Sequence, residues 1–292
     1  MINELQIAAA RKNLAVWQEE ITTATSLGAL QIKGAVRDFL DAQQAPPDTA
    51  ALRRLAEVLA GTEGQTAAQC SPEAAIAFIE AVFAFDGGFS PDEPPSAGQS
   101  LQQGPVTVAY FDSAAFAEAT ARFSLLAGEV TPLPCQSFTA AAEEVANGKA
   151  TFALLPIEDA TQGRLTRFYE QIDRFELHAA AALDVFDAEG TQVRVALVGK
   201  SVLTLHQKAS VRAVECLLFE ESAQSLPLLL QVAAALGLSL RRIDSLPSSY
   251  RDGGFFKHLV LEGGEGACRR LRTYLALFMP RTSVTADYII IT

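Results

Sequence analysis

Apolar side chains recur at helical spacing through the first part of the chain, which predicts a segment built of helices. Pro46 and Pro47 end the first helix, because proline removes a backbone donor and clashes with the preceding turn. Ser71 followed by Pro72 has the form of a helix cap with proline at the first helical position. The apolar positions are Leu5, Ala9, Val16, Trp17, Ile21, Leu27, Leu30, Phe39, Leu52, Leu55, Val58, Leu59, Ile76, Ile79, Val82 and Phe83. We therefore predict a three-helix domain over residues 1–86 that packs on itself or on another subunit.

Glycine and proline interrupt any helical or strand periodicity over residues 87–105, which predicts a linker. Beyond it, residues 106–200 alternate short apolar runs with helical patterns, and Ser137 and Gly148 cap and close one of the helices. The predicted strands are 106–111, 130–133, 152–157, 176–183 and 191–198, and the predicted helices are 113–126 and 137–147. This alternation predicts a small parallel sheet covered by helices.

The last segment, residues 206–292, has the order strand, helix, strand, strand, helix, strand, with Gly237 closing the first helix. The predicted strands are 211–219, 238–243, 255–261 and 288–291, and the helices are 226–236 and 266–278. This order packs two helices on one face of an antiparallel sheet. Such a sheet has exposed edges that commonly pair with a second copy. We therefore predict a multi-domain α/β protein that forms a homodimer through its first and third segments.

Composition narrows the classes of partner. The net charge is -11 with 23 lysines and arginines and no basic cluster, so nucleic acid is not expected as a partner. No apolar run approaches the roughly 20 residues that a membrane helix needs, and no signal peptide is seen, so we expect a cytoplasmic protein without a membrane contact. The four cysteines and three histidines are scattered, which predicts free thiols, no metal and no cofactor.

One ordered motif lies in the middle segment. Residues 133–138 read Leu-Pro-Cys-Gln-Ser-Phe, and a helix ending in Asn147 and Gly148 follows them. The next strand runs into Pro-Ile-Glu-Asp-Ala-Thr-Gln-Gly at residues 156–163. This resembles the prephenate dehydratase signature, in which a strand runs into Pro-Ile-Glu-Asn-Ser/Thr-x-x-Gly. With its helical start and its final segment, the chain resembles the bifunctional chorismate mutase–prephenate dehydratase family, whose last domain is of the ACT type.

The resemblance implies candidate catalytic residues for two reactions. A prephenate dehydratase needs an acid that protonates the leaving hydroxyl and donors that hold the substrate carboxylates. A chorismate mutase needs several basic side chains that converge on a dianion. The matching positions are Thr191, the family's key acid, with Glu158, Asp159 and Thr161 for the dehydratase, and Arg11 and Lys33 for the mutase.

The resemblance to an ACT domain also implies an effector site. In the family, a Gly-Ala-Leu turn that starts the first helix and a Glu-Ser-Arg-Pro strand end line a phenylalanine site. The matching residues here are Gln224, Ser225, Leu226, Asp244, Ser245, Leu246 and Pro247. We therefore expect a small aromatic metabolite or amino acid of the phenylalanine, prephenate or chorismate class as ligand. The alternative is a domain that only pairs subunits.

Two departures from the family pattern bear on catalysis. The family inserts a second lobe between the strands at 176–183 and 191–198, where this chain has only the turn at 184–190, which is too short to hold a lobe. Asp159 replaces the motif asparagine, and an ionised aspartate repels a substrate carboxylate. We therefore predict a catalytically reduced member that acts as a regulatory or partner subunit. The alternative is an active enzyme, either a chorismate mutase or a prephenate dehydratase with Thr191 as the acid.

Overall fold

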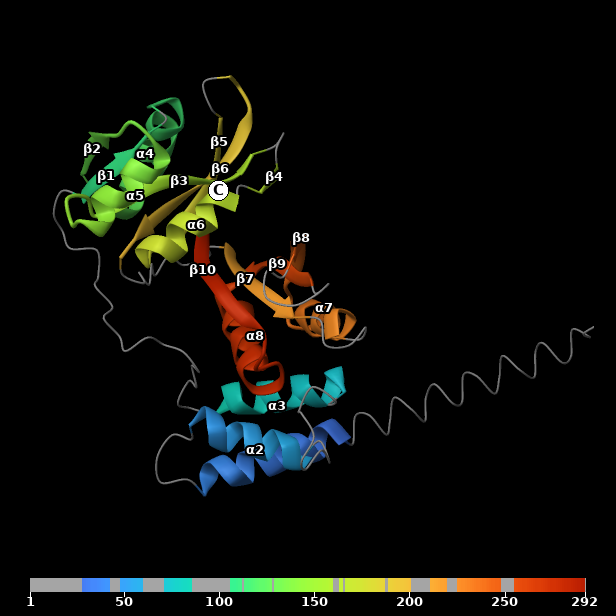
Figure 1. Cartoon of the computed structure of the whole chain (residues 1–292). Helices are drawn as coiled ribbons and strands as arrows, with labels where there is room; N and C mark the ends of the chain where they lie inside the picture. Colours follow the sequence, from blue (N-terminus) through green and yellow to red (C-terminus); the bar gives the residue numbers. More distant parts are fainter. Residues whose placement is uncertain are drawn as a thin grey trace, which may run out of the picture.

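The structure of the chain is a computed structural model (Figure 1). The residues that it describes are 28–42, 48–59, 71–85, 106–111, 113–127, 129–159, 163–164, 166–186, 189–200, 211–219, 225–247 and 255–291. Figure 1 shows three parts along the molecule: the N-terminal helices at one end, the C-terminal strands with their helices between, and the unit formed by residues 106–200 at the other end. We call residues 106–200 the middle unit because they lie in the middle of the sequence. The predicted linker over residues 87–105 lies outside the described residues.

The N-terminal helices pack against the C-terminal part of the same chain. They are a helix at residues 28–41, α2 (Thr49–Leu59) and α3 (Pro72–Ala84), and α2 and α3 both contact α8 (Glu265–Phe278). Ser71 caps α3 as predicted, since its hydroxyl accepts a hydrogen bond from the backbone N of Ala74 at 3.2 Å. The ring of Phe78 meets that of Phe278 edge to face, with 5.7 Å between the centroids. Val36, Leu52 and Ile79 therefore belong to a core shared with α8, whereas Leu30 and Val58 remain exposed by 65% and 54%.

The first half of the middle unit follows the predicted order. Its elements are β1 (Val106–Tyr110), α4 (Ser113–Ala127), β2 (Val130–Pro134), α5 (Phe138–Ala146) and β3 (Phe152–Asp159). Ser137 caps α5 by accepting from the backbone N of Ala140 at 3.1 Å, and Gly148 follows the helix with a φ of 74°. β1 pairs in parallel with both β2 and β3, which confirms the parallel arrangement for these strands.

The second half of the unit corrects the prediction. It comprises β4 (Gly163–Arg164), α6 (Thr166–Phe175), β5 (His178–Phe186) and β6 (Gln192–Gly199). β6 runs antiparallel to both β3 and β5, so the prediction of a wholly parallel sheet is wrong. The physical reason is the short connection at residues 187–191, which can join only antiparallel neighbours, whereas parallel neighbours need a crossover of about a dozen residues or more.

The C-terminal segment has the predicted order of elements. They are β7 (Val211–Phe219), α7 (Ser225–Ala235), β8 (Ser239–Pro247), β9 (Phe255–Gly264), α8 and β10 (Ser283–Ile291). The strands pair antiparallel in the spatial order β10-β7-β9-β8. Along β7, Val214 and Cys216 pack with α7 and α8, whereas Ala213 belongs to the core of the opposite face. That opposite face is turned toward the middle unit.

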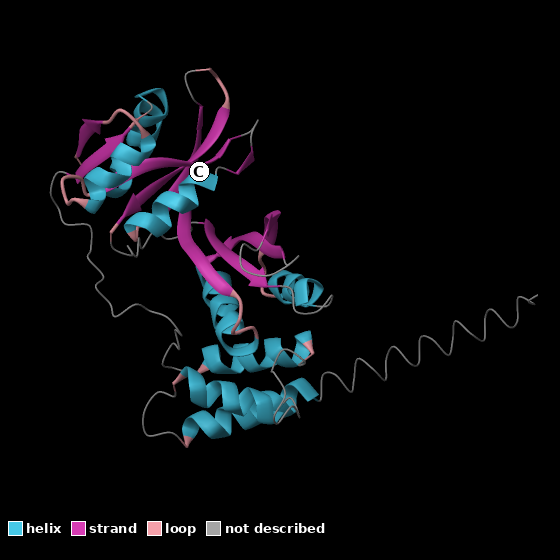
Figure 2. Cartoon of the chain, in the orientation of Figure 1, coloured by secondary structure: helices cyan, strands magenta, loops and turns pink. Residues whose placement is uncertain are grey.

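One continuous sheet joins the middle unit to the C-terminal segment (Figure 2). β10 pairs in parallel with β5, with Ile289 opposite Ala181 and Ile291 opposite Leu183. The whole order is β2-β1-β3-β6-β5-β10-β7-β9-β8, with β4 pairing beside β3. One edge of the four-stranded C-terminal sheet, the outer edge of β10, is therefore paired within the chain and is not open to a second copy.

Candidate functional site

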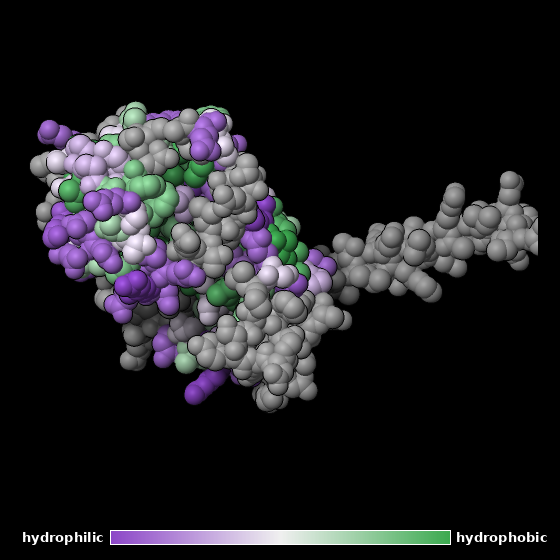
Figure 3. All heavy atoms as spheres, turned by 45° about the horizontal axis from the view of Figure 1, so that its top comes forward, coloured by the Kyte–Doolittle hydropathy of each residue, from purple (hydrophilic) through white to green (hydrophobic). Residues whose placement is uncertain are grey.

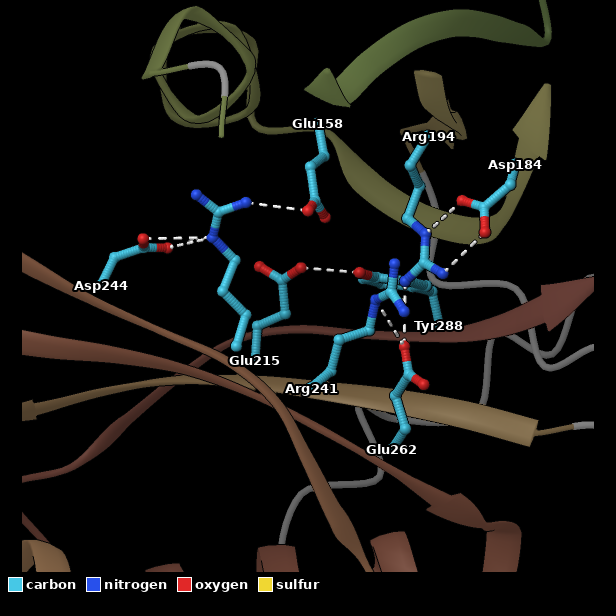
Figure 4. Close-up of polar contacts among 9 residues, drawn as sticks. Glu158, Asp184, Arg194, Glu215, Arg241, Asp244, Glu262 and Tyr288 are labelled. Atoms are coloured by element: carbon cyan, nitrogen blue, oxygen red, sulfur yellow. Dashed lines mark hydrogen bonds and ion pairs between the residues drawn. The ribbon is translucent and has the colours of Figure 1, made fainter. Parts of the chain in front are cut away.

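Charged side chains gather where the middle unit faces β8 and β9 (Figure 4). We call this set the ion-pair cluster; its members are Glu158, Asp184, Arg194, Arg241, Arg242, Asp244 and Glu262. Glu158 on β3 and Asp184 on β5 lie opposite Arg194 on β6 on its two sides, so the three side chains share one face of the sheet. Strand pairing thus places the glutamate of the Pro-Ile-Glu motif inside this cluster.

Arg194 is the most buried cation of the cluster, with only 6% of its side chain exposed. Its Nε donates to Asp184 Oδ1 at 2.8 Å, and its Nη1 donates to Glu262 Oε1 on β9 at 2.9 Å. Burial opposes the charged form of Arg194, yet the hydrogen bonds to the two carboxylates outweigh burial and raise its pKa. Arg194 therefore stays charged and ties β6 to the C-terminal sheet.

Arg242 makes the second link across the same space. Its Nε donates to Asp244 Oδ2 at 2.8 Å, and its Nη1 donates to Glu158 Oε1 at 2.8 Å. The hydrogen bond to Asp244 raises the pKa of Arg242, and the bond to Glu158 adds to this effect. Arg241 contributes a longer contact, with its Nε 3.3 Å from Glu262 Oε1. Within the cluster, three guanidinium groups therefore meet four carboxylates of the chain itself.

A second polar cluster lies in the core between α6 and the C-terminal strands. Glu215 on β7 is fully buried; its two carboxylate oxygens accept hydrogen bonds from the hydroxyls of Tyr169 and Tyr288, each at 2.7 Å. The Nε2 of His258, itself 2% exposed, lies 3.4 Å from Glu215. Donors from two elements satisfy the carboxylate and offset its desolvation.

The structure brings only some of the predicted catalytic residues to the ion-pair cluster. Glu158 lies in it, and the backbone of Asp159 pairs with Val193 beside it. Thr191 is half-buried immediately before β6. Thr161 lies outside the described residues.

Only one of the two predicted mutase residues lies in the described part of the chain. Lys33 binds Glu80 of α3, with 2.5 Å between Nζ and Oε2. Arg11 lies outside the described residues.

The predicted effector residues fall on two neighbouring elements. Ser225 begins α7 and Leu226 packs against its core, while Gln224 lies outside the described residues. On β8, Asp244 is bound by Arg242, and Ser245 accepts a hydrogen bond from Lys257 Nζ at 2.9 Å. Leu246 and Pro247 end the strand. α7 contacts β8, but Asp244 pairs with His258 and lies on the face of the sheet turned toward the middle unit, whereas α7 covers the other face.

Sequence reasoning missed most members of both clusters. None of Asp184, Arg194, Arg242, Glu262 and Glu215 was among the predicted site residues. A single charged residue on a predicted strand does not indicate a site, because its partners are known only once the strands are paired. A usable signal was the alternation around Arg242 and Asp244, since two opposite charges two residues apart on a strand point to the same side.

Within the described residues, no group of three or more His, Cys, Asp or Glu side chains is placed to hold a metal ion. No helix of the described part combines the length and apolar character needed to cross a bilayer. Cys135, Cys216 and Cys268 are free thiols, as predicted for them.

A protein-family model and several solved structures are similar to parts of this chain. The family model of prephenate dehydratase matches residues 109–218, so the chain carries a prephenate dehydratase-like domain. The fold resembles the prephenate dehydratase of Streptococcus mutans, with a TM-score of 0.50 and 19% identity over 64% of this chain and 100% of that chain. No curated protein matches the chain.

Two further solved structures are similar at lower scores. The prephenate dehydratase of Arthrobacter aurescens in complex with L-Phe has a TM-score of 0.45 and 17% identity over 63% of this chain and 90% of that one. A protein described as a quorum-quenching acylase, GqqA, has a TM-score of 0.47 and 17% identity over 63% of this chain and 94% of that chain.

Proposed function

We propose that this chain is a catalytically reduced prephenate dehydratase-like protein of phenylalanine metabolism, acting as a metabolite-binding regulatory or partner subunit. One observation carries the proposal: charged side chains of the dehydratase-like strands are bound within the chain. Arg194 is held between Asp184 and Glu262, and Glu158 is held by Arg242. A dianionic substrate needs converging donors, and donors engaged in this way must first leave their internal partners.

The short connection between β5 and β6 supports the same proposal. The family resemblance places a second lobe at this point, whereas here residues 187–191 join the two strands directly. Without a second wall, water stays in contact with bound substrate, and electrostatic interactions with the substrate are weaker in water than in an enclosed site.

The test of reduced catalysis is direct. Purified full-length protein is mixed with prephenate and phenylpyruvate is followed, with the Streptococcus mutans prephenate dehydratase as the positive control. We expect turnover indistinguishable from the protein-free reaction. Turnover that is lost in Thr191→Ala and kept in Thr131→Ala, an exposed threonine on the edge strand β2, would overturn the proposal.

The second candidate function is an active dehydratase with Thr191 as its acid. The supporting observation is its position: Thr191 is half-buried and immediately precedes β6, the strand that pairs with the motif strand β3. The same prephenate assay decides between the two candidates, because an acid removed at this position would lower turnover about 100-fold or more.

A chorismate mutase activity of residues 1–86 is the remaining enzyme candidate. The ion pair between Lys33 and Glu80 weighs against it, because this cation is already partnered. Chorismate consumption by the full-length protein and by Arg11→Ala tests it. Consumption above the spontaneous rate that falls in Arg11→Ala would establish the mutase; no consumption removes it.

We also propose that residues 206–292 form an ACT-like effector domain. The spatial strand order β10-β7-β9-β8 with two helices on one face supports it. Thermal shifts with phenylalanine, tyrosine, tryptophan, chorismate and prephenate test for the ligand, because a ligand that binds only the folded state raises its stability. No shift with any of them would favour a domain that only pairs subunits.

Finally, we propose a cytoplasmic homodimer. β8 lies at the end of the described sheet and exposes Leu240 and Ile243 by 41% and 40%. On the face seen in Figure 3, groups of apolar side chains lie among hydrophilic ones over the described residues. An open edge strand with apolar side chains favours pairing with a second copy. Light scattering of the purified protein should give twice the chain mass of 31.2 kDa, and the monomer mass would contradict the proposal.

A further inference from the structure

Three arginines lie beside α8, on the face of the C-terminal sheet that is turned away from the ion-pair cluster. Arg212 on β7 shares this face with Val214, which packs in the core that α8 covers. Asp287 on β10 lies opposite Val214, so its side chain points to the same face. Arg269 and Arg272 are three positions apart on α8 and are therefore neighbours on one side of that helix. We call the three arginines and Asp287 the α8 arginine cluster.

Asp287 orients two of the guanidinium groups but neutralises only one. Its Oδ1 accepts hydrogen bonds from Arg212 Nε at 3.0 Å and Nη2 at 2.8 Å, and its Oδ2 lies 2.9 Å from Arg272 Nη1. The two arginines therefore keep one uncompensated positive charge. Arg272 Nε is buried without a hydrogen-bond partner among the described residues, and a buried N–H of this kind needs an acceptor.

Arg269 adds a second uncompensated charge. Its guanidinium carbon lies 5.8 Å from the ring centroid of Phe83 on α3, and that of the adjacent Arg270 lies 5.7 Å from the same centroid. Neither of the two forms an ion pair with a carboxylate of the described part of the chain. Glu265 in the first turn is the single acidic residue of α8. Cations therefore exceed carboxylates on this side of the molecule.

We propose that the α8 arginine cluster binds an anion of the phosphate class, either free phosphate or the phosphate group of a small metabolite. Guanidinium groups bind phosphate oxygens through paired N–H donors, and a dianion suits two uncompensated cations. Such an anion would also supply the acceptor that Arg272 Nε lacks. This inference goes beyond the proposed function and does not depend on it.

The cluster is open enough for a small anion to enter. Arg212 is 12% exposed, Asp287 14% and Arg272 21%. Partial burial reduces screening by water and strengthens each contact with a bound charge. The chain as a whole carries a net charge of -11 and repels anions at long range, so binding depends on these local donors.

Calorimetric titration of the full-length protein with inorganic phosphate tests the site, with sodium chloride of equal ionic strength as the reference. We expect saturable binding with a Kd of about 1 mM or lower and a higher thermal unfolding midpoint in phosphate, because a ligand that binds only the folded state stabilises it. Sulfate should bind similarly. Acetate carries one charge on two oxygens and should bind at least about tenfold more weakly.

Two variants locate the binding. Arg269→Gln removes a cation without touching the ion pairs of Asp287, so we expect phosphate to bind about fivefold more weakly or worse. Arg272→Gln also removes the fork and should weaken binding at least about tenfold. Arg174→Gln removes the same charge from an exposed position on α6 of the middle unit and should bind phosphate as the wild type does. If Arg272→Gln does not fold, Arg269→Gln decides alone.

A cluster with only a structural role predicts a different result. In that case Arg272→Gln would lower the unfolding midpoint, and phosphate would bind no variant differently from the wild type. That result, or no saturable phosphate binding by the wild type, overturns the proposal. Acetate that binds as tightly as phosphate overturns the assignment to the phosphate class. Methyl phosphate separates the two sources, because tighter binding than inorganic phosphate assigns the site to a phosphate monoester and weaker binding to free phosphate, and either supports the site.

Discussion

The hydroxyl of Tyr169 donates a hydrogen bond to Glu215 Oε2 across 2.7 Å, although the two residues lie 46 positions apart in the chain. Tyr169 belongs to α6 of the middle unit, whereas Glu215 is fully buried on β7 of the C-terminal sheet. The other carboxylate oxygen accepts from Tyr288 on β10. The bond therefore holds α6 on the same sheet that β5 and β10 complete.

Replacing Tyr169 by phenylalanine should lower the free energy of unfolding by about 1–3 kcal/mol. The substitution keeps the ring and removes one donor to a buried carboxylate, which is left undersatisfied. Urea unfolding followed by circular dichroism measures the change. Tyr110→Phe, whose ring stacks on Phe116, is the matched control and should change stability by less than about 0.5 kcal/mol. Equal stabilities of the two variants would contradict the importance of the bond.

The free energy of unfolding should fall at acid pH, partly because Asp184 becomes protonated. Burial by itself would raise the pKa of Asp184, but the hydrogen bonds and charge of Arg194 outweigh burial and hold the pKa below its ordinary value. A carboxyl with a depressed folded pKa stabilises the fold above its unfolded pKa of about 4 and loses that stabilisation as the pH falls toward the folded pKa.

Asp184→Asn should therefore be less stable than the wild type at neutral pH, and the difference should shrink below about pH 4. Urea unfolding at a series of pH values tests this. Asp173→Asn changes an exposed aspartate of α6 and leaves the Arg194 contact intact. A gap between wild type and Asp184→Asn that stays constant down to about pH 3 would refute the assignment.

Two glycines should respond to alanine in opposite senses. A Cβ at Gly199 would lie 2.9 Å from two ring carbons of the buried Phe152 and 3.3 Å from the carbonyl oxygen of Thr151, so Gly199→Ala should cost about 1–3 kcal/mol. A Cβ at Gly34, in the helix at residues 28–41, would meet nothing within 4 Å. Gly34→Ala should stabilise by about 0.5–1 kcal/mol through helix propensity. Thermal unfolding midpoints that shift in the same direction would contradict this prediction.

The buried thiols should be inert in the folded protein. Burial raises the pKa of Cys216 to about 12, and burial likewise raises the pKa of Cys268 to about 12. Because the thiolate is the reactive form, alkylation at pH 8 should be far slower in buffer than in urea. Peptide mapping after iodoacetamide treatment separates the individual cysteines. Rapid labelling of Cys216 or Cys268 in buffer would show that the core between the sheet and α8 opens readily.

Local sequence patterns were sufficient to predict most of the helices and strands. Ser137 and Gly148 marked both ends of α5, because a side-chain cap and a residue with positive φ are dictated by a few neighbouring positions. The order of elements over residues 211–291 followed in the same way from period and turn residues. The motif at 156–163 identified the dehydratase-like strand, and the family model agrees over residues 109–218.

The pairing of strands that lie far apart in the sequence could not be predicted from such patterns. Nothing in the local sequence of β5 or β10 specifies the parallel pairing of Ala181 with Ile289, since any apolar strand would suit the same neighbour. For the same reason the contact between Arg242 and Glu158, 84 positions apart, could not be predicted. The ion-pair cluster depends on the spatial order of the strands, which the local sequence does not reveal.

The central place of β10 has a consequence for biosynthesis. Among the described strands it is the last to be translated, yet it fills the gap between β5 and β7. Until residues 283–291 emerge from the ribosome, the nascent chain carries two half-sheets, each with an open hydrogen-bonding edge. Such open edges can pair with neighbouring nascent chains, so the risk of misassembly is highest before β10 emerges.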